Sequence, residues 1–214
     1  MTKRKNVDDV TSNIPGSEGK SRKYGMSTLA VHAGARPDPV TGARGTPIYQ
    51  TTSFVFDDAE HGAELFNLQT FGYVYSRMTN PTVSVFEERV AQLEGGRGAV
   101  ATSSGHAAQF IAAATLMEAG DEFIASRNLY GGSVTQFGVS FPKLGWKCNF
   151  VDPTDPENFE KAMNDKVKFI FCEGVANPGG IILDLEKIAD IAHKHGVLLI
   201  VDNTLASPYL LRPF

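Results

Sequence analysis

The chain has 214 residues, 42% of them hydrophobic and 21% charged, which is typical of a globular protein able to bury a sizeable core. Its formal net charge of −4, from 20 Lys and Arg against 24 Asp and Glu, argues against nucleic-acid or anionic-membrane partners. Two cysteines, Cys148 and Cys172, are too few for a disulfide scaffold, and the first residues lack the apolar segment of a secretory signal. We therefore expect a cytoplasmic protein.

The first part of the chain shows little periodicity. Residues 1–24 mix charged residues with Ser and Gly, without an apolar repeat, which predicts a flexible tail. A stretch rich in Gly and Pro follows at 34–46 and is typical of a loop. We treat residues 25–79 as an arm and residues 80–214 as the start of a regular domain.

From Asn80 onward, apolar runs alternate between helical and strand patterns. The expected helices cover 81–94, 107–117, 133–144, 156–163 and 184–195, and the expected strands cover 99–102, 122–125, 147–151, 167–172 and 197–201. The helix at 107–117 is apolar nearly all round, so we expect it to be buried on several sides. Apolar strands alternating with helices predict an α/β fold of three layers around a mostly parallel sheet.

Ligands of such sheets bind beyond the carboxyl ends of the strands. Four polar segments stand there, and a fifth lies upstream: Ser103-Ser104-Gly105-His106, Tyr130-Gly131-Gly132, Asn177-Pro178, Asp202-Asn203-Thr204 and Tyr75-Ser76-Arg77. Each alone is equally compatible with a turn, a helix cap or a surface residue. Together they predict a pocket for an anionic, planar ring that carries a nitrogen, a description that fits pyridoxal 5′-phosphate.

At this point a resemblance becomes specific. The matching segments run in order from about Leu29 to Phe214: residues 47–54, 75–77, 80–82, 103–105, 130–132, 177–178 and 201–204. The sequence resembles the Cys/Met-metabolism family of pyridoxal-phosphate enzymes, and within it the sulfhydrylase branch that acts on O-acetylhomoserine. The resemblance implies the aspartate-aminotransferase-like fold, known as fold type I, for a large domain that begins here and is truncated.

The resemblance also implies roles for individual residues. The phosphate would be bound by Ser104, Gly105 and His106 at a helix N-terminus. Tyr130 would stack on the ring as a catalytic residue, and Asp202, also catalytic, would keep the ring nitrogen protonated so that the ring serves as an electron sink.

Further implied contacts come from four more residues. Asn177 would contact the 3-oxygen side of the ring, and Thr204 would support the cofactor. Tyr75 and Arg77 would reach the phosphate of a neighbouring subunit, so that sites are shared across a dimer within a homotetramer, a dimer of dimers.

One departure from the family pattern is large. The family's cofactor-binding lysine lies in a Ser-x-Thr-Lys segment shortly after Asp-Asn-Thr, whereas no lysine follows Lys194 in this sequence. The smaller C-terminal domain of the family is also missing. We therefore expect residues 80–214 to be the first part of the cofactor-binding domain, and the chain alone to be inactive.

The implied activity is a γ-replacement in methionine biosynthesis that makes homocysteine, or methionine, from O-acetylhomoserine and a sulfide or thiol. Cystathionine γ-synthase and methionine or cystathionine γ-lyase activities remain alternatives, as does an inactive fragment that binds cofactor or a partner. A dinucleotide-binding protein is disfavoured because Gly96–Ala101 matches G-x-G-x-x-A but precedes a predicted strand instead of following one. No metal site is expected, since His193 and His195 do not share a helix face.

Overall fold

A computed structural model describes residues 24–214 of the chain. The expected tail at 1–24 therefore lies almost wholly outside the described residues. The chain forms two compact units, one reaching to Ala101 and including Phe214, the other running from Thr102 to Pro213. Each is described below by itself.

The first unit contains helices α1 (Met26–His32), α2 (Ala59–Phe66) and α3 (Pro81–Glu94). Helix α3 begins and ends as its sequence predicts. The Asn80 side chain caps it by accepting a hydrogen bond from Thr82 N, Pro81 occupies its first position, and Gly95 ends it in the left-handed conformation at φ +79°.

The start of α3 also anchors the irregular segment before it. Asn80 Nδ2 donates hydrogen bonds to Tyr49 O and to Ser76 Oγ. Thr82 Oγ1 donates to Pro47 O and accepts a hydrogen bond from Tyr49 N. Asn80 and Thr82 thus hold the backbone of the segment at 47–49, and Asn80 also holds the side chain of Ser76.

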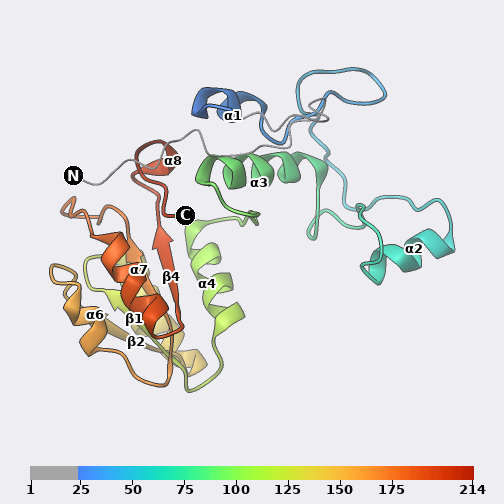
Figure 1. Cartoon of the computed structure of the whole chain (residues 1–214). Helices are drawn as coiled ribbons and strands as arrows, with labels where there is room; N and C mark the ends of the chain where they lie inside the picture. The colour runs from blue at the N-terminus through green and yellow to red at the C-terminus, as the bar shows by residue number, and fades with distance from the viewer. Residues whose placement is uncertain (1–23) are drawn as a thin grey trace. The chain divides into compact units, whose positions relative to one another are not determined.

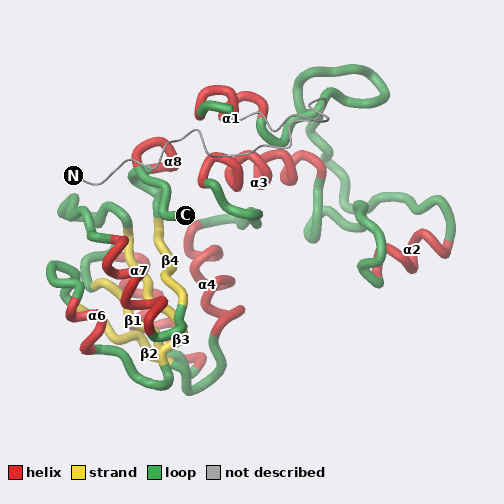
Figure 2. Tube along the Cα trace, viewed as in Figure 1, coloured by secondary structure: helices red, strands yellow, loops and turns green. Residues whose placement is uncertain are grey.

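The second unit is built on a four-stranded parallel sheet in the order β2-β1-β3-β4 (Figure 1 and Figure 2). The strands are β1 (Glu122–Ser126), β2 (Lys147–Val151), β3 (Val167–Glu173) and β4 (Leu198–Asp202). Its helices are α4 (Gly105–Leu116), α5 (Gly131–Thr135), α6 (Glu157–Lys161), α7 (Leu185–Lys194) and α8 (Ser207–Leu210). A π-helical segment (Gln136–Ser140) and a 3₁₀ segment (Phe141–Leu144) continue α5. This is the α/β architecture that the sequence predicts.

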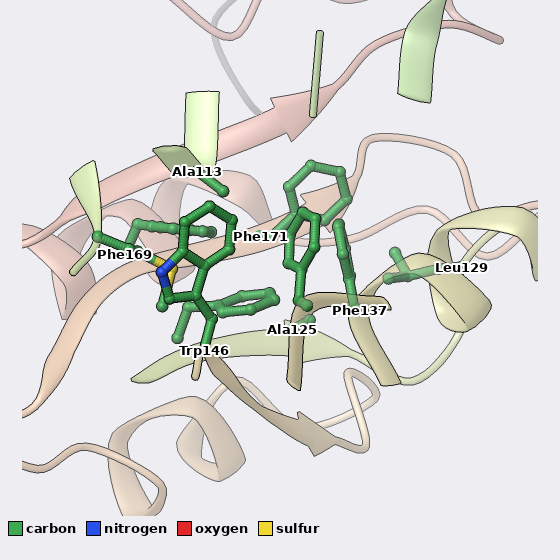
Figure 3. Close-up of a cluster of buried hydrophobic side chains, with 10 residues drawn as sticks. Ala113, Ala125, Leu129, Phe137, Trp146, Phe169 and Phe171 are labelled. Atoms are coloured by element: carbon green, nitrogen blue, oxygen red, sulfur yellow. The ribbon is translucent and has the colours of Figure 1, made fainter. Parts of the chain in front are cut away.

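Two clusters of buried side chains cover the two faces of this sheet. We call the first the aromatic cluster (Figure 3): Ala113, Met117, Phe123, Ala125, Leu129, Phe137, Phe141, Trp146, Phe169 and Phe171. The second, the aliphatic cluster, contains Ile124, Phe159, Val167, Ile170, Cys172, Leu183, Ile188 and Ala192. Helix α4 and the segment after β1 supply the first cluster, whereas α6 and α7 supply the second.

Two sequence expectations were wrong. Residues 99–102 do not form a strand: Ala101 N donates to the Glu87 carboxylate instead of joining a ladder. Helix α4 is not buried on several sides within the described residues: Ala113 and the following Met117 are buried in the aromatic cluster, while Phe110 and Ile111 stay 43% and 49% exposed. Apolar composition predicts burial, but the number of neighbouring elements limits it.

Candidate active site

The site grows from the alternation of side chains along β3 and β4. Phe169 and Phe171 of β3 point into the aromatic cluster, and Ile200 of β4 packs against it. Because side chains alternate along a strand, the next residues on the same face are Glu173 and Asp202. These two residues are partners in the register of the parallel pair. Two carboxylates therefore lie side by side where the aromatic face ends.

A cavity of about 300 Å³ opens at this edge of the sheet. It is lined by Ser104, Gly105, His106, Gln109, Tyr130, Glu173, Val175, Asn177, Asp202, Thr204 and Leu205. Seven of the nine residues singled out from the sequence are among them, drawn from the segments after β1, β3 and β4 and from the start of α4. The volume of this cavity lies at the lower limit of the range typical of ligand-binding cavities, about 300–1,000 Å³.

The N-terminus of α4 lines part of the cavity. Ser104 Oγ caps the helix by accepting from Ala107 N at 3.1 Å, and Ala108 N makes the first main-chain bond, to Ser104 O. The amides of Gly105 and His106 precede these bonds, so they point outward from the helix start. Together with the helix dipole they favour an anion here.

An aromatic pair forms a second wall. The rings of His106 and Tyr130 lie 5.9 Å apart at an interplanar angle of 38°. Gly132 lies so close that a Cβ built there would be 2.5 Å from Tyr130 Cε1 and 2.6 Å from the His106 ring. A glycine is therefore required for both rings to keep these positions. Tyr130 is 51% exposed, leaving its ring accessible to a planar ligand.

The acidic end of the cavity is tightly bonded. Asp202 Oδ1 accepts hydrogen bonds from the backbone amide of Thr204, at 3.0 Å, and from its hydroxyl. Asp202 Oδ2 accepts from Gln109 Nε2 at 3.4 Å, and the same amide nitrogen donates to Ser133 Oγ at 2.9 Å. The carboxylate is thus held from two sides.

Glu173 links two loops of the site. Its side chain is 4% exposed, and its two oxygens accept hydrogen bonds from Tyr130 N at 2.6 Å and from Asn177 N at 2.8 Å. Charge-assisted bonds of this kind offset the cost of burying a carboxylate. Glu173 therefore fixes the loop that carries Tyr130 relative to the loop that carries Asn177.

Sequence reasoning missed Gln109 and Glu173, although both left a signal. Gln109 is the one polar side chain at helical spacing with Ala113 and Met117, on the stripe that faces the sheet. Glu173 directly continues the apolar run of β3. A polar residue at a position where the hydrophobic pattern predicts a buried side chain needs hydrogen-bond partners. Here those partners are residues of the site.

Tyr75 and Arg77 belong to the first unit. Tyr75 forms an isolated antiparallel bridge with Ser53, and the Arg77 guanidinium carbon lies 5.4 Å from the Tyr75 ring centroid. Both side chains are exposed. They are not among the residues that line the cavity of the second unit.

Other reactive groups lie apart from the cavity. Burial raises the pKa of the Cys172 thiol to about 12, helped by the neighbouring Glu173, and it also raises the pKa of Cys148.

Within residues 24–214, no group of three or more His, Cys, Asp or Glu side chains is placed to hold a metal ion. The same part of the chain contains no helix that is long and apolar enough to cross a membrane.

Comparison with known proteins decides the family. A family model described as Cys/Met metabolism PLP-dependent enzyme matches residues 27–214. The chain belongs to this family. Two curated members are O-acetyl-L-homoserine sulfhydrylase of Leptospira meyeri, 48% identical over 199 residues, and O-acetyl-L-homoserine sulfhydrylase 1 of Thermus thermophilus, 50% identical over 190 residues. The alignments cover 93% and 88% of this chain but 45% of each relative, so the chain spans about half the length of the curated relatives it matches.

A solved structure shows the same fold. The crystal structure of a putative O-acetylhomoserine (thiol)-lyase from Campylobacter jejuni is 38% identical, with a TM-score of 0.87 over 89% of this chain and 47% of that one. That protein carries N'-pyridoxyl-lysine-5'-monophosphate. The expected fold class, a mostly parallel α/β domain of the pyridoxal-phosphate family, is thus confirmed.

Proposed function

We propose that this chain forms the cofactor-binding part of an enzyme that makes homocysteine from O-acetylhomoserine and sulfide. The observation that carries the proposal is one cavity lined by the N-terminus of α4, by two carboxylates and by an accessible tyrosine. Relatives named O-acetyl-L-homoserine sulfhydrylase and homocysteine synthase supply the choice of substrate.

The residues present fit pyridoxal 5′-phosphate. Its phosphate suits the amides of Gly105 and His106, with the Ser104 hydroxyl beside them. Among the described side chains that line the cavity there is no lysine or arginine to neutralise Glu173 and Asp202. A protonated ring nitrogen would supply the missing positive charge, which is the chemistry expected of a pyridinium held by Asp202.

The other cavity residues would position the cofactor. Tyr130 has an accessible ring and would stack on the cofactor, Asn177 lines the cavity and would donate to the 3-oxygen, and Thr204 holds Asp202. When bound, the cofactor draws off the negative charge that develops on the amino-acid substrate as its Cα proton leaves. The contribution of this chain is to orient the ring and to keep its nitrogen charged.

The lysine that would remove that proton is not in this sequence, which has no lysine after Lys194. The decisive experiment therefore uses the protein produced from its whole reading frame. With O-acetylhomoserine and sulfide, it should release homocysteine and acetate. Asp202→Asn should lower kcat at least about a hundredfold, because an amide does not keep the ring nitrogen protonated.

Each other result points elsewhere. Release of acetate, 2-oxobutyrate and ammonia without homocysteine would indicate a γ-lyase, and turnover that requires cysteine as the sulfur nucleophile would indicate cystathionine γ-synthase. If the whole protein does not bind the cofactor, the proposed enzyme activity is wrong and the alternative of an inactive protein applies.

We also propose that Tyr75 and Arg77 complete the site of a neighbouring subunit in a cytoplasmic dimer of dimers. Arg77 presents a planar guanidinium suited to a phosphate. Mixing inactive Arg77→Ala and Asp202→Asn proteins tests this, since a mixed dimer contains one intact site. Activity should recover to about a quarter of the wild-type value if subunits exchange at random. No recovery in verified mixed dimers would place both residues in the site of one subunit.

A further inference from the structure

Gln109 occupies an unusual place on α4. Ala113 and Met117, four and eight residues further along, are buried in the aromatic cluster, so the stripe that begins at Gln109 faces the sheet. A glutamine on such a stripe removes polar atoms from water and must find partners for them. What it bonds to therefore indicates why it is there.

Its amide nitrogen has two partners. Gln109 Nε2 donates to Ser133 Oγ at 2.9 Å and to Asp202 Oδ2 at 3.4 Å. The orientation of the amide follows from the carboxylate, because the opposite orientation would set two acceptor oxygens against each other. Ser133 is completely buried, so it gives Gln109 a fixed support.

The carbonyl oxygen of the same amide is buried and has no partner among the described residues. An unsatisfied buried acceptor costs free energy, which an apolar side chain of similar length would avoid. Stability of the core alone therefore does not account for Gln109, and the bond to Asp202 is the feature that an apolar residue could not replace.

The two oxygens of Asp202 are held by different elements. Thr204, two residues further along the chain, engages Oδ1, whereas Gln109 on α4 engages Oδ2. With Thr204 alone the carboxylate could pivot about Oδ1. The second contact, from the helix whose N-terminus also lines the cavity, restricts this rotation.

We propose that Gln109 is a positioning residue that orients the Asp202 carboxylate toward the ring nitrogen of the bound cofactor. The inference rests on the proposed function and deepens it. Because Gln109 acts through Asp202, its effect should depend on the presence of that ring nitrogen.

The test compares two ligands on the apoprotein made from the whole reading frame. One is pyridoxal 5′-phosphate, and the other is its analogue with carbon in place of the ring nitrogen; equilibrium binding is followed by quenching of protein fluorescence. Gln109→Met should weaken binding of the cofactor about five- to tenfold, the size expected for the loss of one hydrogen bond of ordinary strength, and binding of the analogue less than about twofold.

Thr115→Val is the matched control. Thr115 is an exposed residue of the same helix whose hydroxyl bonds only to the backbone at Ile111 O, so the substitution should leave both affinities unchanged. If Gln109→Met does not fold, as judged by its thermal unfolding, Gln109→Asn serves instead, since it keeps an amide but draws it back by one methylene.

The outcomes separate the two proposals. Equal losses for cofactor and analogue would show a purely structural role and overturn the inference, as would unchanged binding of both. Failure of the wild-type protein to bind the cofactor at all would instead overturn the proposed function.

Discussion

The aromatic face and the aliphatic face of the four-stranded sheet use alternate residues of the same strands. On β3, Phe169 and Phe171 belong to the aromatic cluster, while Ile170 and Cys172 belong to the aliphatic one. On β3, the alternating residues on the aromatic face lead to Glu173, which lines the cavity, whereas those on the aliphatic face do not lead to a cavity residue within the strand. The same alternation on β4 leads from Ile200 to Asp202.

The difference shows how one sheet can separate stability from chemistry. The aliphatic face, covered by α6 and α7, has no carboxylate at the cavity, so its packing can change without moving a site residue. Helix α4 contributes both to the aromatic face and to the cavity. Its residue Ala113 packs in the aromatic cluster, and Ser104, which caps the start of the helix, lines the cavity. Packing and binding should therefore be coupled on one face only.

The largest expected effect tests the aromatic face. Phe123→Ala removes a ring that lies 4.7 Å from Phe169 and 5.1 Å from Phe137, centroid to centroid. It should lower the free energy of unfolding by about 3–5 kcal/mol, measured by urea denaturation. Cofactor affinity should fall as well. A loss below about 1 kcal/mol would mean that the cluster is loosely packed.

Gly132→Ala tests the wall of the cavity directly. The new methyl group would displace the rings of Tyr130 and His106, so cofactor affinity should fall about tenfold, equivalent to ~1.4 kcal/mol, while unfolding changes little. Gly138→Ala is a matched control, since its Cβ would meet only Phe150, at an ordinary 3.7 Å. Equal affinities for the two variants would contradict the crowding at Gly132.

Ile170→Val probes the opposite face with a smaller change. Ile170 is completely buried, so loss of one methylene should lower stability by about 0.5–1.5 kcal/mol. Cofactor affinity should stay at the wild-type value in the same titration. A clear drop in affinity would show that both faces are coupled to the site.

The smallest effect concerns the amino end of β1, away from the cavity. Hydrogen bonds from Asn149 and Asn164, with Lys147 adding another and its charge, lower the pKa of Glu122 to about 2 from 4.5. The ionised carboxylate therefore stabilises the fold above about pH 4.5, and this contribution is lost as the pH falls toward 2.

Glu122→Gln should accordingly cost about 1 kcal/mol at pH 7 and progressively less below pH 4.5. Unfolding curves of both proteins at a series of pH values measure the difference. A cost that stays constant down to pH 2 would assign it to packing instead of charge. Cofactor affinity at pH 7 should be unaffected, unlike that of Asp202→Asn.

Local signals in the sequence were sufficient for much of this structure. The cap and stop of α3 at Asn80 and Gly95, and the run of parallel strands from β1 to β4, follow from short-range patterns. The seven cavity residues could be grouped in advance because the carboxyl ends of parallel strands meet at one edge.

What the sequence did not predict depends on partners distant in the chain. Residues 99–102 have strand-like composition, but a strand also needs a neighbour, and Ala101 N bonds to Glu87 instead. Gln109 meets Asp202 across 93 positions of sequence, and Glu173 meets Tyr130 across 43. Periodicity marks such residues as misplaced but does not identify what they touch.

The bonds of Glu173 to Tyr130 N and Asn177 N have a consequence for local motion. Two loops that share one buried carboxylate open together, because releasing either amide leaves the carboxylate less well satisfied for the other. In hydrogen exchange, these two amides should therefore show matched protection although they lie on different loops. The cavity wall would then respond to heat or denaturant as a single cooperative unit.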